Sequence, residues 1–314
     1  MPIQKNRLLP YGVYRRLWNY LPVRYSQMFS QPADLNIFFN FIVPPRVDGK
    51  VMSVVHDLTY KRFPETMKAS NLKHLERGMP YSMKRSDRII TVSEFTKREL
   101  CDLMDIPKEK VSVVYNAPSL VKNCTPYEEV RQKYKIQREY ILFVSTIEPR
   151  KNIVRLLKAY EQLKEQYKIP HQLVMAGGKG WQDERIFQVV NGLRYKDDII
   201  FTGFVTPEEK NTLYQNACLF VFPSIYEGFG IPPLEAMAWD CPCVCADAAS
   251  IPEVVGDAAC LVDPFEEESI ANGIIKVLTE PEYAKQLREK GALQVQKFTW
   301  DRSVEQLLLA CEQV

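Results

Sequence analysis

The chain has 314 residues, a quarter of them charged, and a formal net charge of +2. That length suits two hydrophobic cores better than one. A charge this close to zero gives no reason to expect nucleic acid as a partner, and no apolar run approaches the length that spans a bilayer. Eight cysteines without a framework spacing indicate a reducing compartment, so we expect a cytoplasmic location.

Residues 1–33 depart from this neutral balance, because they carry basic side chains and no acidic one, interleaved with aromatic residues. A basic, aromatic segment of this kind can lie on an anionic membrane surface. It can equally form a helix that packs on its own domain. The two interpretations stay open, and the first predicts peripheral contact with the inner face of the membrane.

Predicted strands and helices alternate along the first half of the chain. Short apolar runs predict strands at 34–43, 51–55, 88–92 and 111–114. Helical patterns fill 66–86 and the segment that begins at Ser93, a residue type that caps helices. A polar, proline-marked stretch at 116–126 predicts a linker.

The second half repeats the alternation more regularly. Strands are predicted at 140–145 and within HQLVMAGG, DDIIFTG, ACLFVFPS, PCVCA and AACLVD. Helices are predicted at 151–166, 182–193, 233–239, 266–279, 281–297 and 300–314, with a further start marked by Thr206 and Pro207. Alternation on this scale predicts an α/β protein with two doubly wound parallel sheets.

Ligands bind such sheets at the carboxyl ends of the strands, where loops lead into helices. The loop STIEPRKN follows the predicted strand at 140–145 and places Arg150 and Lys151 at the start of a helix. Two cations beside a helix N-terminus suit a diphosphate. The alternative is an ordinary helix start with two solvated charges.

A second loop, EGFGIPPLE, has glycines between two glutamates. Glycine permits a close approach of the backbone to a ligand, and the prolines mark a helix start, so the amides of Phe229, Gly230 and Ile231 could face a phosphate. Glu227 and Glu235 could face one pocket, where a carboxylate accepts from a sugar diol. Alternatively, Glu235 caps a turn and Glu227 pairs with a lysine.

Two further features allow both a functional and a structural interpretation. Cys241, Cys243 and Cys245 alternate and therefore share one face of a strand, which favours a buried core strand over a metal cluster. His56 ends a strand in VVHDL, where it could donate a hydrogen bond to a sugar hydroxyl or to a developing charge. It could also simply tie down its own loop.

Together, these motifs resemble the retaining glycosyltransferases of family four. The features are EGFGIPPLEA, STIEPRKN, the GG turn at 177–178, the FTGFV turn and HDL at 56–58. The resemblance covers 34–314 and implies the GT-B fold, in which two doubly wound domains face a cleft. It divides the chain into an acceptor-side domain at 1–122, a nucleotide-sugar domain at 123–299, and a last helix at 300–314 that crosses back to the first domain.

The resemblance also implies a reaction and its residues. EPRKN with AGGKGW is most similar to members that use GDP-mannose, and so implies transfer of mannose to a glycan or lipid-linked acceptor. Catalytic roles fall to Glu227, His56 and Lys151, and Arg150 with Lys151 neutralises the diphosphate together with the amides of Phe229, Gly230 and Ile231. Glu235 binds the ribose, and the backbone near Gly203 and Phe204 reads the base. The family uses neither a metal nor a cofactor, because cations and helix dipoles take that role.

The chain departs from the family pattern in three places. No glycine-rich loop precedes 34–43, no arginine stands near Thr146, and Tyr115-Asn116-Ala117 replaces the commoner linker entry. We therefore expect a shortened first domain, with catalytic activity affected more than nucleotide binding. The alternatives are a protein that binds a nucleotide-sugar without turnover, a nucleotide-sugar epimerase, and a dinucleotide oxidoreductase. The last is disfavoured because no GxGxxG follows a strand.

Overall fold

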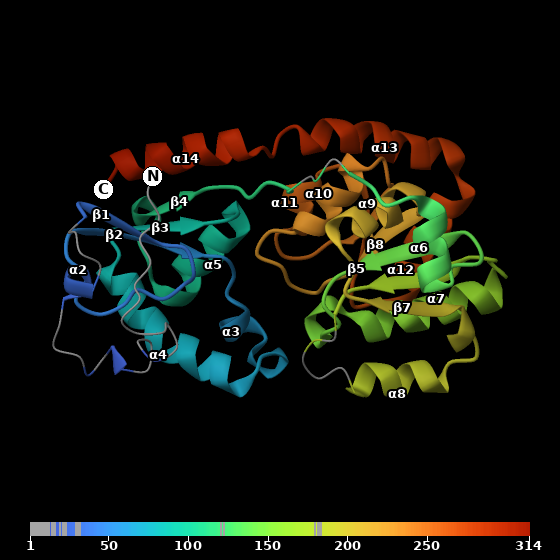
Figure 1. The fold of residues 1–314 in the computed structure, drawn as a ribbon, viewed down its shortest axis with the longest axis horizontal. Helices are drawn as coiled ribbons and strands as arrows, with labels where there is room; N and C mark the ends of the chain where they lie inside the picture. The colour runs from blue at the N-terminus through green and yellow to red at the C-terminus, as the bar shows by residue number, and fades with distance from the viewer. Residues whose placement is uncertain are drawn as a thin grey trace.

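The computed structural model describes residues 13, 17–18, 20, 24–28, 33–119, 121, 123–178, 180 and 184–314. Two α/β units lie side by side, and the first runs from blue to green and the second from green to red in Figure 1. Most of 1–33 lies outside the described residues, so the membrane-surface hypothesis stays a prediction. Among the described residues, no helix is both long and apolar enough to cross a membrane.

The first unit is built on a parallel sheet in the order β1-β2-β3-β4. Its strands are β1 (Leu35–Phe38), β2 (Lys50–Val55), β3 (Arg88–Thr91) and β4 (Val111–Val113). The predicted strand 34–43 ends early, because Phe41 takes a positive φ of 58° and its amide donates to the carbonyl of Val54. The chain therefore turns at 39–42 toward the carboxyl end of β2.

The second unit is built on a parallel sheet in the order β10-β9-β8-β5-β6-β7. Its strands are β5 (Tyr140–Val144), β6 (Gln172–Ala176), β7 (Ile199–Gly203), β8 (Leu219–Phe222), β9 (Cys243–Ala246) and β10 (Ala259–Val262). Numbered from β5, this is the order 3-2-1-4-5-6 of a dinucleotide-binding sheet, which reverses between β5 and β8. The predicted doubly wound α/β class is confirmed.

Helices flank both sheets, and most begin within two residues of their predicted starts. In the first unit they are α2 (Tyr25–Met28), α3 (Thr59–Arg62), α4 (Ala69–Arg85) and α5 (Glu94–Met104). In the second they are α6 (Tyr127–Tyr134), α7 (Ile153–Gln166), α8 (Glu184–Gly192), α9 (Pro207–Asn216), α10 (Ile231–Ala238), α11 (Ile251–Val255), α12 (Glu267–Thr279), α13 (Pro281–Val295) and α14 (Trp300–Glu312). Sequence analysis missed α3, α6 and α11, which are short.

Local chemistry fixes several of these helix starts. The Ser93 side chain accepts from the amide of Thr96 at the start of α5. Thr206 and Glu209 form a capping box at the start of α9, as the sequence there indicates. The alternating cysteines Cys243 and Cys245 lie fully buried in β9, so their interpretation as core residues is confirmed.

Several sets of contacts join the units, and two of them involve α11 and α14. The Glu253 carboxylate of α11 accepts from the amides of Glu94 and Phe95 at 2.7 and 2.8 Å, which places an acid at the N-terminus of α5. The helix α14 runs back over the first unit in Figure 1. There the hydroxyl of Ser303 donates to the carbonyl of Tyr115 at 2.6 Å.

Candidate active site

The candidate site lies where the strand order of the second sheet reverses, since loops from the carboxyl ends of β5 and β8 meet there. The β5 loop is braced by the GG turn after β6, because the amide of Ile147 donates to the carbonyl of Gly178 at 3.1 Å. It then forms a 3₁₀ turn at Pro149–Lys151 and enters α7 through Asn152, whose φ is 61°. The amide nitrogen of the Asn152 side chain donates to the carbonyls of Pro223 and Pro264. These bonds join the β5 loop to the loops that follow β8 and β10.

Glu227 is the centre of a buried ion-pair cluster. One carboxylate oxygen accepts from Lys151 Nζ at 2.6 Å and the other from Arg150 at 2.8 Å. Arg150 also donates to the carbonyl of Tyr226 at 2.6 Å and pairs with Glu148 at 2.9 Å. The sequence alternative in which Glu227 pairs with a lysine is therefore what the structure shows, and that lysine is the one predicted to bind the diphosphate.

Charge keeps this cluster ionised in spite of its burial. Burial raises the pKa of Glu227, but the charges of Lys151 and Arg150 outweigh it and lower the pKa to about 2. Burial by itself would lower the pKa of Arg150. The negative charges of Glu227, Glu148 and Asp57 outweigh this effect, so the pKa of Arg150 is raised. The two cations are held at a fixed place by acid side chains, and a bound anion would share them with Glu227.

The glycine loop leads from Glu227 into α10. Gly230 has a φ of 108°, a conformation that glycine adopts without strain, and is the N-cap of α10. The hydroxyl of Ser250 lies within hydrogen-bond distance of the carbonyls of Glu227 and Phe229, at 2.8 and 2.9 Å. It therefore holds the glycine loop in place. Within the described chain, no acceptor is recorded for the amides of Phe229 and Gly230, which leaves them available to a ligand.

Gly228 has a different role from the one that its sequence pattern predicts. A Cβ atom at this position would lie 1.7 Å from the carbonyl oxygen of His56 in the other unit. The carbonyl of Gly228 accepts from the hydroxyls of Ser93 and Thr96 at 2.7 and 3.1 Å. This glycine therefore allows the two units to approach each other rather than a ligand to approach the loop.

Glu235 follows in α10 and is also buried and paired. Its carboxylate accepts from Lys210 Nζ at 2.7 Å and from the Tyr214 hydroxyl at 3.3 Å. The backbone turn near Gly203 ends β7, and there Gly203 has a φ of 70° and the ring of Phe204 is exposed. The roles predicted for these residues, ribose binding and base binding, stay predictions.

His56 lies across the cleft at the end of β2. Its Nε2 is 2.7 Å from the carbonyl oxygen of Phe39, so this nitrogen must carry the proton. In the neutral ring Nδ1 is then an acceptor, and only the imidazolium form donates from it. The next residue, Asp57, accepts from the amide of Thr59 and contributes to the field around Arg150.

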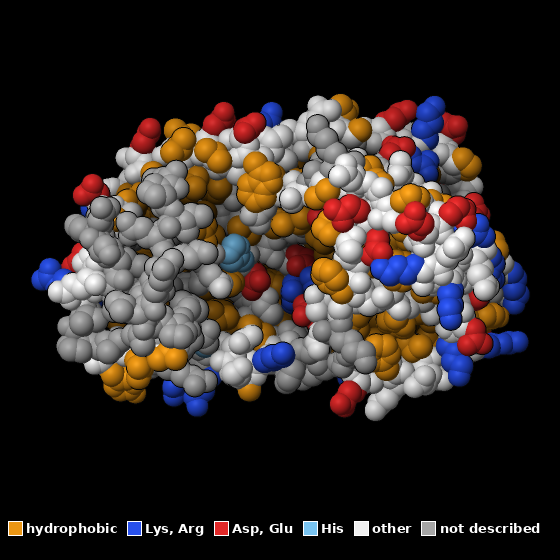
Figure 2. Space-filling model, in the orientation of Figure 1, with side chains coloured by type: hydrophobic (Ala, Val, Ile, Leu, Met, Phe, Trp, Pro, Cys, Tyr) orange, Lys and Arg blue, Asp and Glu red, His pale blue; other side chains and the backbone are white. Residues whose placement is uncertain are grey.

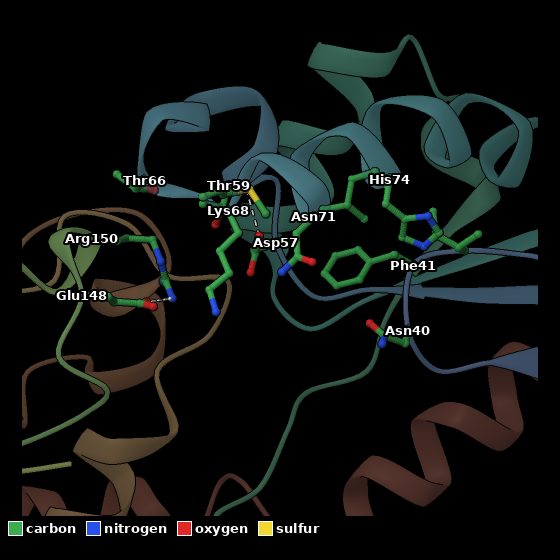
Figure 3. A pocket seen from close by; sticks show the side chains of 13 residues that line it. Asn40, Phe41, Asp57, Thr59, Thr66, Lys68, Asn71, His74, Glu148 and Arg150 are labelled. Carbon is green, nitrogen blue, oxygen red and sulfur yellow. Dashed lines mark hydrogen bonds and ion pairs between the residues drawn. The ribbon is translucent and has the colours of Figure 1, made fainter. Parts of the chain in front are cut away.

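A cavity of about 430 Å³ opens between the two units beside Arg150. Figure 2 shows a hollow in the middle of the molecule where acidic, basic and histidine side chains meet. In Figure 3, Lys68, Asn71 and Asp57 point into this space from the first unit, opposite Arg150 and Glu148. Its other lining side chains include Asn40, Phe41, Thr59, Thr66 and His74.

Sequence analysis missed several residues of this site. Lys210 and Glu148 pair with predicted site residues, Asp57 faces Arg150, and Ser250 holds the glycine loop. Asp57 and Glu148 stand beside the motif residues His56 and Pro149, and that adjacency was the signal available. Nothing near Lys210 or Ser250 in the sequence indicates the site, because both reach it only through the fold.

Two facing α/β units with parallel sheets, and a charged pocket beside the switch point of the second sheet, define the GT-B class of glycosyltransferase fold. Comparison with known families agrees, since the profile of glycosyl transferases group 1 matches residues 126–294 and that of Glycosyltransferase Family 4 matches residues 7–119. The chain belongs to the glycosyl transferases group 1 family and is a glycosyltransferase.

The similar proteins include enzymes of polysaccharide synthesis. The chain is 32% identical over 278 residues to the O-antigen chain mannosyltransferase B of Escherichia coli, which covers 86% of this chain and 72% of that protein. It is 31% identical over 263 residues to the Escherichia coli serotype-specific mannosyltransferase WbdA, which covers 81% of this chain and only 32% of that protein. A solved structure, Anabaena HepE in complex with UDP-glucose, superposes with a TM-score of 0.73 at 18% identity and covers 97% of this chain and 83% of that one.

Proposed function

We propose that the protein transfers a mannosyl residue from GDP-mannose to a glycan acceptor, which can be lipid-linked, with retention of anomeric configuration and without a metal. The observation that carries the proposal is the buried cluster of Lys151, Arg150 and Glu227 beside the amides of Phe229 and Gly230. Cations and unpaired amides at one place match the needs of a leaving nucleoside diphosphate. The mannosyltransferase relatives support mannose as the sugar.

The donor would bind with its diphosphate between the two cations and the start of α10. Glu227 would then share Lys151 and Arg150 with the phosphates and lie next to the transferred sugar. Glu235, one helical turn beyond the N-cap, would accept from the ribose hydroxyls, and the exposed turn at Gly203 and Phe204 would contact the base. Both carboxylate oxygens of Glu227 already accept from cations, which disfavours Glu227 as a covalent nucleophile.

Transfer would therefore proceed on one face of the sugar. The bond between the sugar and the diphosphate breaks first through an oxocarbenium-like state, and the departing phosphate oxygen takes the proton of the attacking hydroxyl. The cations of Lys151 and Arg150 stabilise the charge that develops on the leaving group. His56 would accept from a hydroxyl of the transferred sugar through Nδ1, or donate to it when protonated.

The acceptor would enter the cavity between the units. Lys68, Asn71 and Asp57 face this space from the first unit, and Phe41 offers an apolar ring at its far end. Neutral and mixed-charge hydrogen-bonding groups beside an aromatic ring suit a neutral sugar. A glycan that ends in an uncharged residue is the acceptor that this lining fits.

The donor assignment is tested by calorimetric titration of GDP, UDP, ADP and dTDP. We expect GDP to bind most tightly, and Glu235→Ala to weaken GDP binding by roughly 10-fold through the loss of a charge-assisted contact to the ribose. Glu282→Ala, which removes an exposed acid from α13, is the control. Tightest binding of UDP would overturn GDP as the donor base, in line with the UDP-glucose bound by HepE.

Turnover separates the enzyme from a protein that only binds the nucleotide-sugar. Incubation with GDP-mannose and a mannose-terminated oligosaccharide should yield an extended product in the presence of a chelator. Nuclear magnetic resonance of that product should show the anomeric configuration of the donor. Binding of GDP-mannose without any product, over a panel of such acceptors, would favour the non-catalytic alternative.

A further inference from the structure

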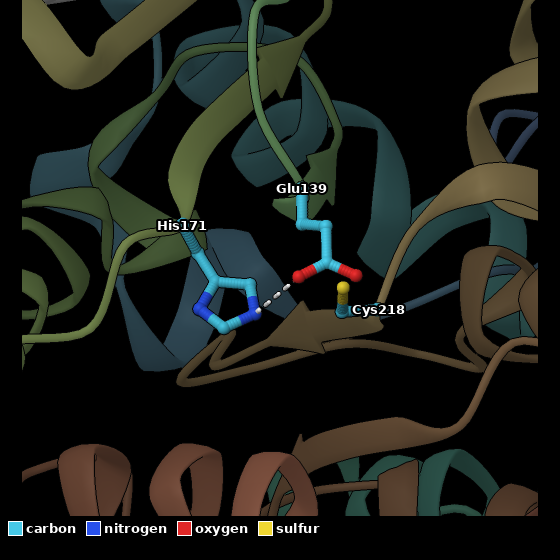
Figure 4. A group of neighbouring side chains, drawn as sticks. All are labelled: Glu139, His171 and Cys218. Carbon is cyan, nitrogen blue, oxygen red and sulfur yellow. Dashed lines mark ion pairs between the residues drawn. The ribbon is translucent and has the colours of Figure 1, made fainter.

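Three potential metal ligands meet at one edge of the second sheet. The loops of the candidate active site, which follow β5 and β8, lie at the opposite edge. Glu139, His171 and Cys218 directly precede β5, β6 and β8, which are neighbours in the sheet. Because parallel strands all begin at one edge, the three side chains converge there although they are far apart in sequence. A carboxylate oxygen, a ring nitrogen and the sulfur lie within 4.8 Å of one another (Figure 4).

Ordinary hydrogen bonding does not account for this arrangement. His171 Nε2 lies 3.9 Å from Glu139 Oε2, which is too far for a hydrogen bond. Nε2 is the ring nitrogen that faces Glu139 in Figure 4, and no hydrogen bond holds it among the described residues, so it is available to a ligand that Glu139 would share. The other ring nitrogen, Nδ1, lies on the far side of the ring and has no hydrogen-bond partner in the described chain either.

The ligand types and their spacing match a transition-metal ion. Carboxylate, imidazole and thiolate are the groups that bind zinc in proteins. Two ligand atoms about 2.1 Å from a tetrahedral ion lie roughly 3.4 Å apart, so the present separations, 3.9 Å between His171 and Glu139 and at most 4.8 Å within the group, would have to shorten when the ion binds. Glu139 can move toward the other two ligands, because its side chain is 74% exposed and free to rotate.

We propose that Glu139, His171 and Cys218 bind a divalent transition-metal cation of the zinc type, with water as a fourth ligand. The thiol proton of Cys218 leaves to solvent as the metal–sulfur bond forms. Lys164 and Arg138 both pair with Asp198, which offsets part of the positive charge near His171. The ion would join the starts of three central strands and stabilise the second unit.

This site is independent of the donor chemistry. The donor loops follow the carboxyl ends of β5 and β8, and the proposed ligands precede the same strands, a full strand length away. Chelation should therefore lower the melting temperature and leave GDP affinity unchanged. Loss of the metal site and loss of the proposed transferase function are thus separate outcomes.

The test is a Co²⁺ titration of the chelator-treated full chain. We expect one equivalent to bind with tetrahedral ligand-field bands and a thiolate charge-transfer band, and Zn²⁺ to displace it and raise the melting temperature. Cys218→Ser should remove the charge-transfer band and weaken Zn²⁺ binding by at least about 10-fold. The control is Cys124→Ser, which removes an exposed cysteine outside the group and should change neither.

A second variant keeps the test decisive if Cys218→Ser fails to fold. Glu139→Gln alters an exposed side chain and should fold as the unaltered chain does, yet it should also weaken Zn²⁺ binding. The absence of one-to-one binding by the unaltered chain would overturn the proposal. Equal Zn²⁺ affinity in Cys218→Ser and the unaltered chain would overturn it as well.

Discussion

The two walls of the cleft differ in how their charges are held. On the wall of the second unit, the buried Glu227 pairs with the buried Lys151 and with the half-buried Arg150. On the wall of the first unit, Lys68 and Asn71 point into the cavity, and no partner is recorded for either side chain among the described residues. A preorganised wall suits a ligand with fixed charges, the donor diphosphate, and an open wall suits an acceptor recognised by neutral hydrogen bonds.

The strongest way to break this comparison is Glu227→Gln. The amide keeps the shape but no longer accepts both cations, so transfer should fall by about 100-fold or more. GDP affinity should hold or rise, because the diphosphate no longer shares Lys151 and Arg150 with an acid. Calorimetry and an initial-rate assay on the same preparation measure both, and a parallel loss of GDP affinity would contradict the shared-cation arrangement.

The same variant has a signature in acid stability. The pKa of Glu227 is lowered from 4.5 to about 2, so its ion pairs stabilise the fold fully above about pH 4.5. That stabilisation is lost as the pH falls from about 4.5 to about 2. Urea denaturation across this range should show a steeper fall in the free energy of unfolding for the unaltered chain than for Glu227→Gln.

Lys151→Ala sharpens the comparison at the donor wall. Removal of one charge-assisted contact should weaken GDP binding by about 1.5–3 kcal/mol, roughly 10- to 150-fold. Lys158→Ala is the control, because Lys158 lies on α7 and its exposed side chain pairs with Glu267 and not with Glu227. Unchanged GDP affinity in Lys151→Ala, measured by calorimetry, would refute the diphosphate assignment.

Asn71→Ala tests the acceptor wall and should have the smallest effect. Loss of a neutral hydrogen bond at an open site is worth about 0.5–1.5 kcal/mol, so the KM for the acceptor should rise a few-fold to about 10-fold. GDP affinity should stay the same, because the side chain lies on the opposite wall. Steady-state kinetics at varied acceptor concentration measures this KM. A change in the KM for the donor instead would contradict the placement of Asn71 in the acceptor site.

The architecture could be read largely from the sequence. Apolar runs and helix caps gave the strands and most helices, because strand burial and capping leave local patterns such as those at Ser93 and Thr206. The structure differs from the prediction where tertiary contacts set the backbone conformation. At Phe41, for example, a hydrogen bond from its amide to the carbonyl of Val54 ends β1 earlier than predicted. Short helices such as α11 carry too few residues for a periodic signal.

Within the site, the residue types and their spacing are visible in the sequence. Which side chains pair with one another depends on the fold. Lys151, Arg150, Glu227 and Glu235 stand in loops and helix starts that motif and strand order make recognisable. Only the fold paired Glu227 with Lys151 and Glu235 with Lys210, placed Gly228 against His56, and gathered Glu139, His171 and Cys218 at one sheet edge. These contacts join segments that are distant along the chain, and local propensity carries no information about which distant segments will meet.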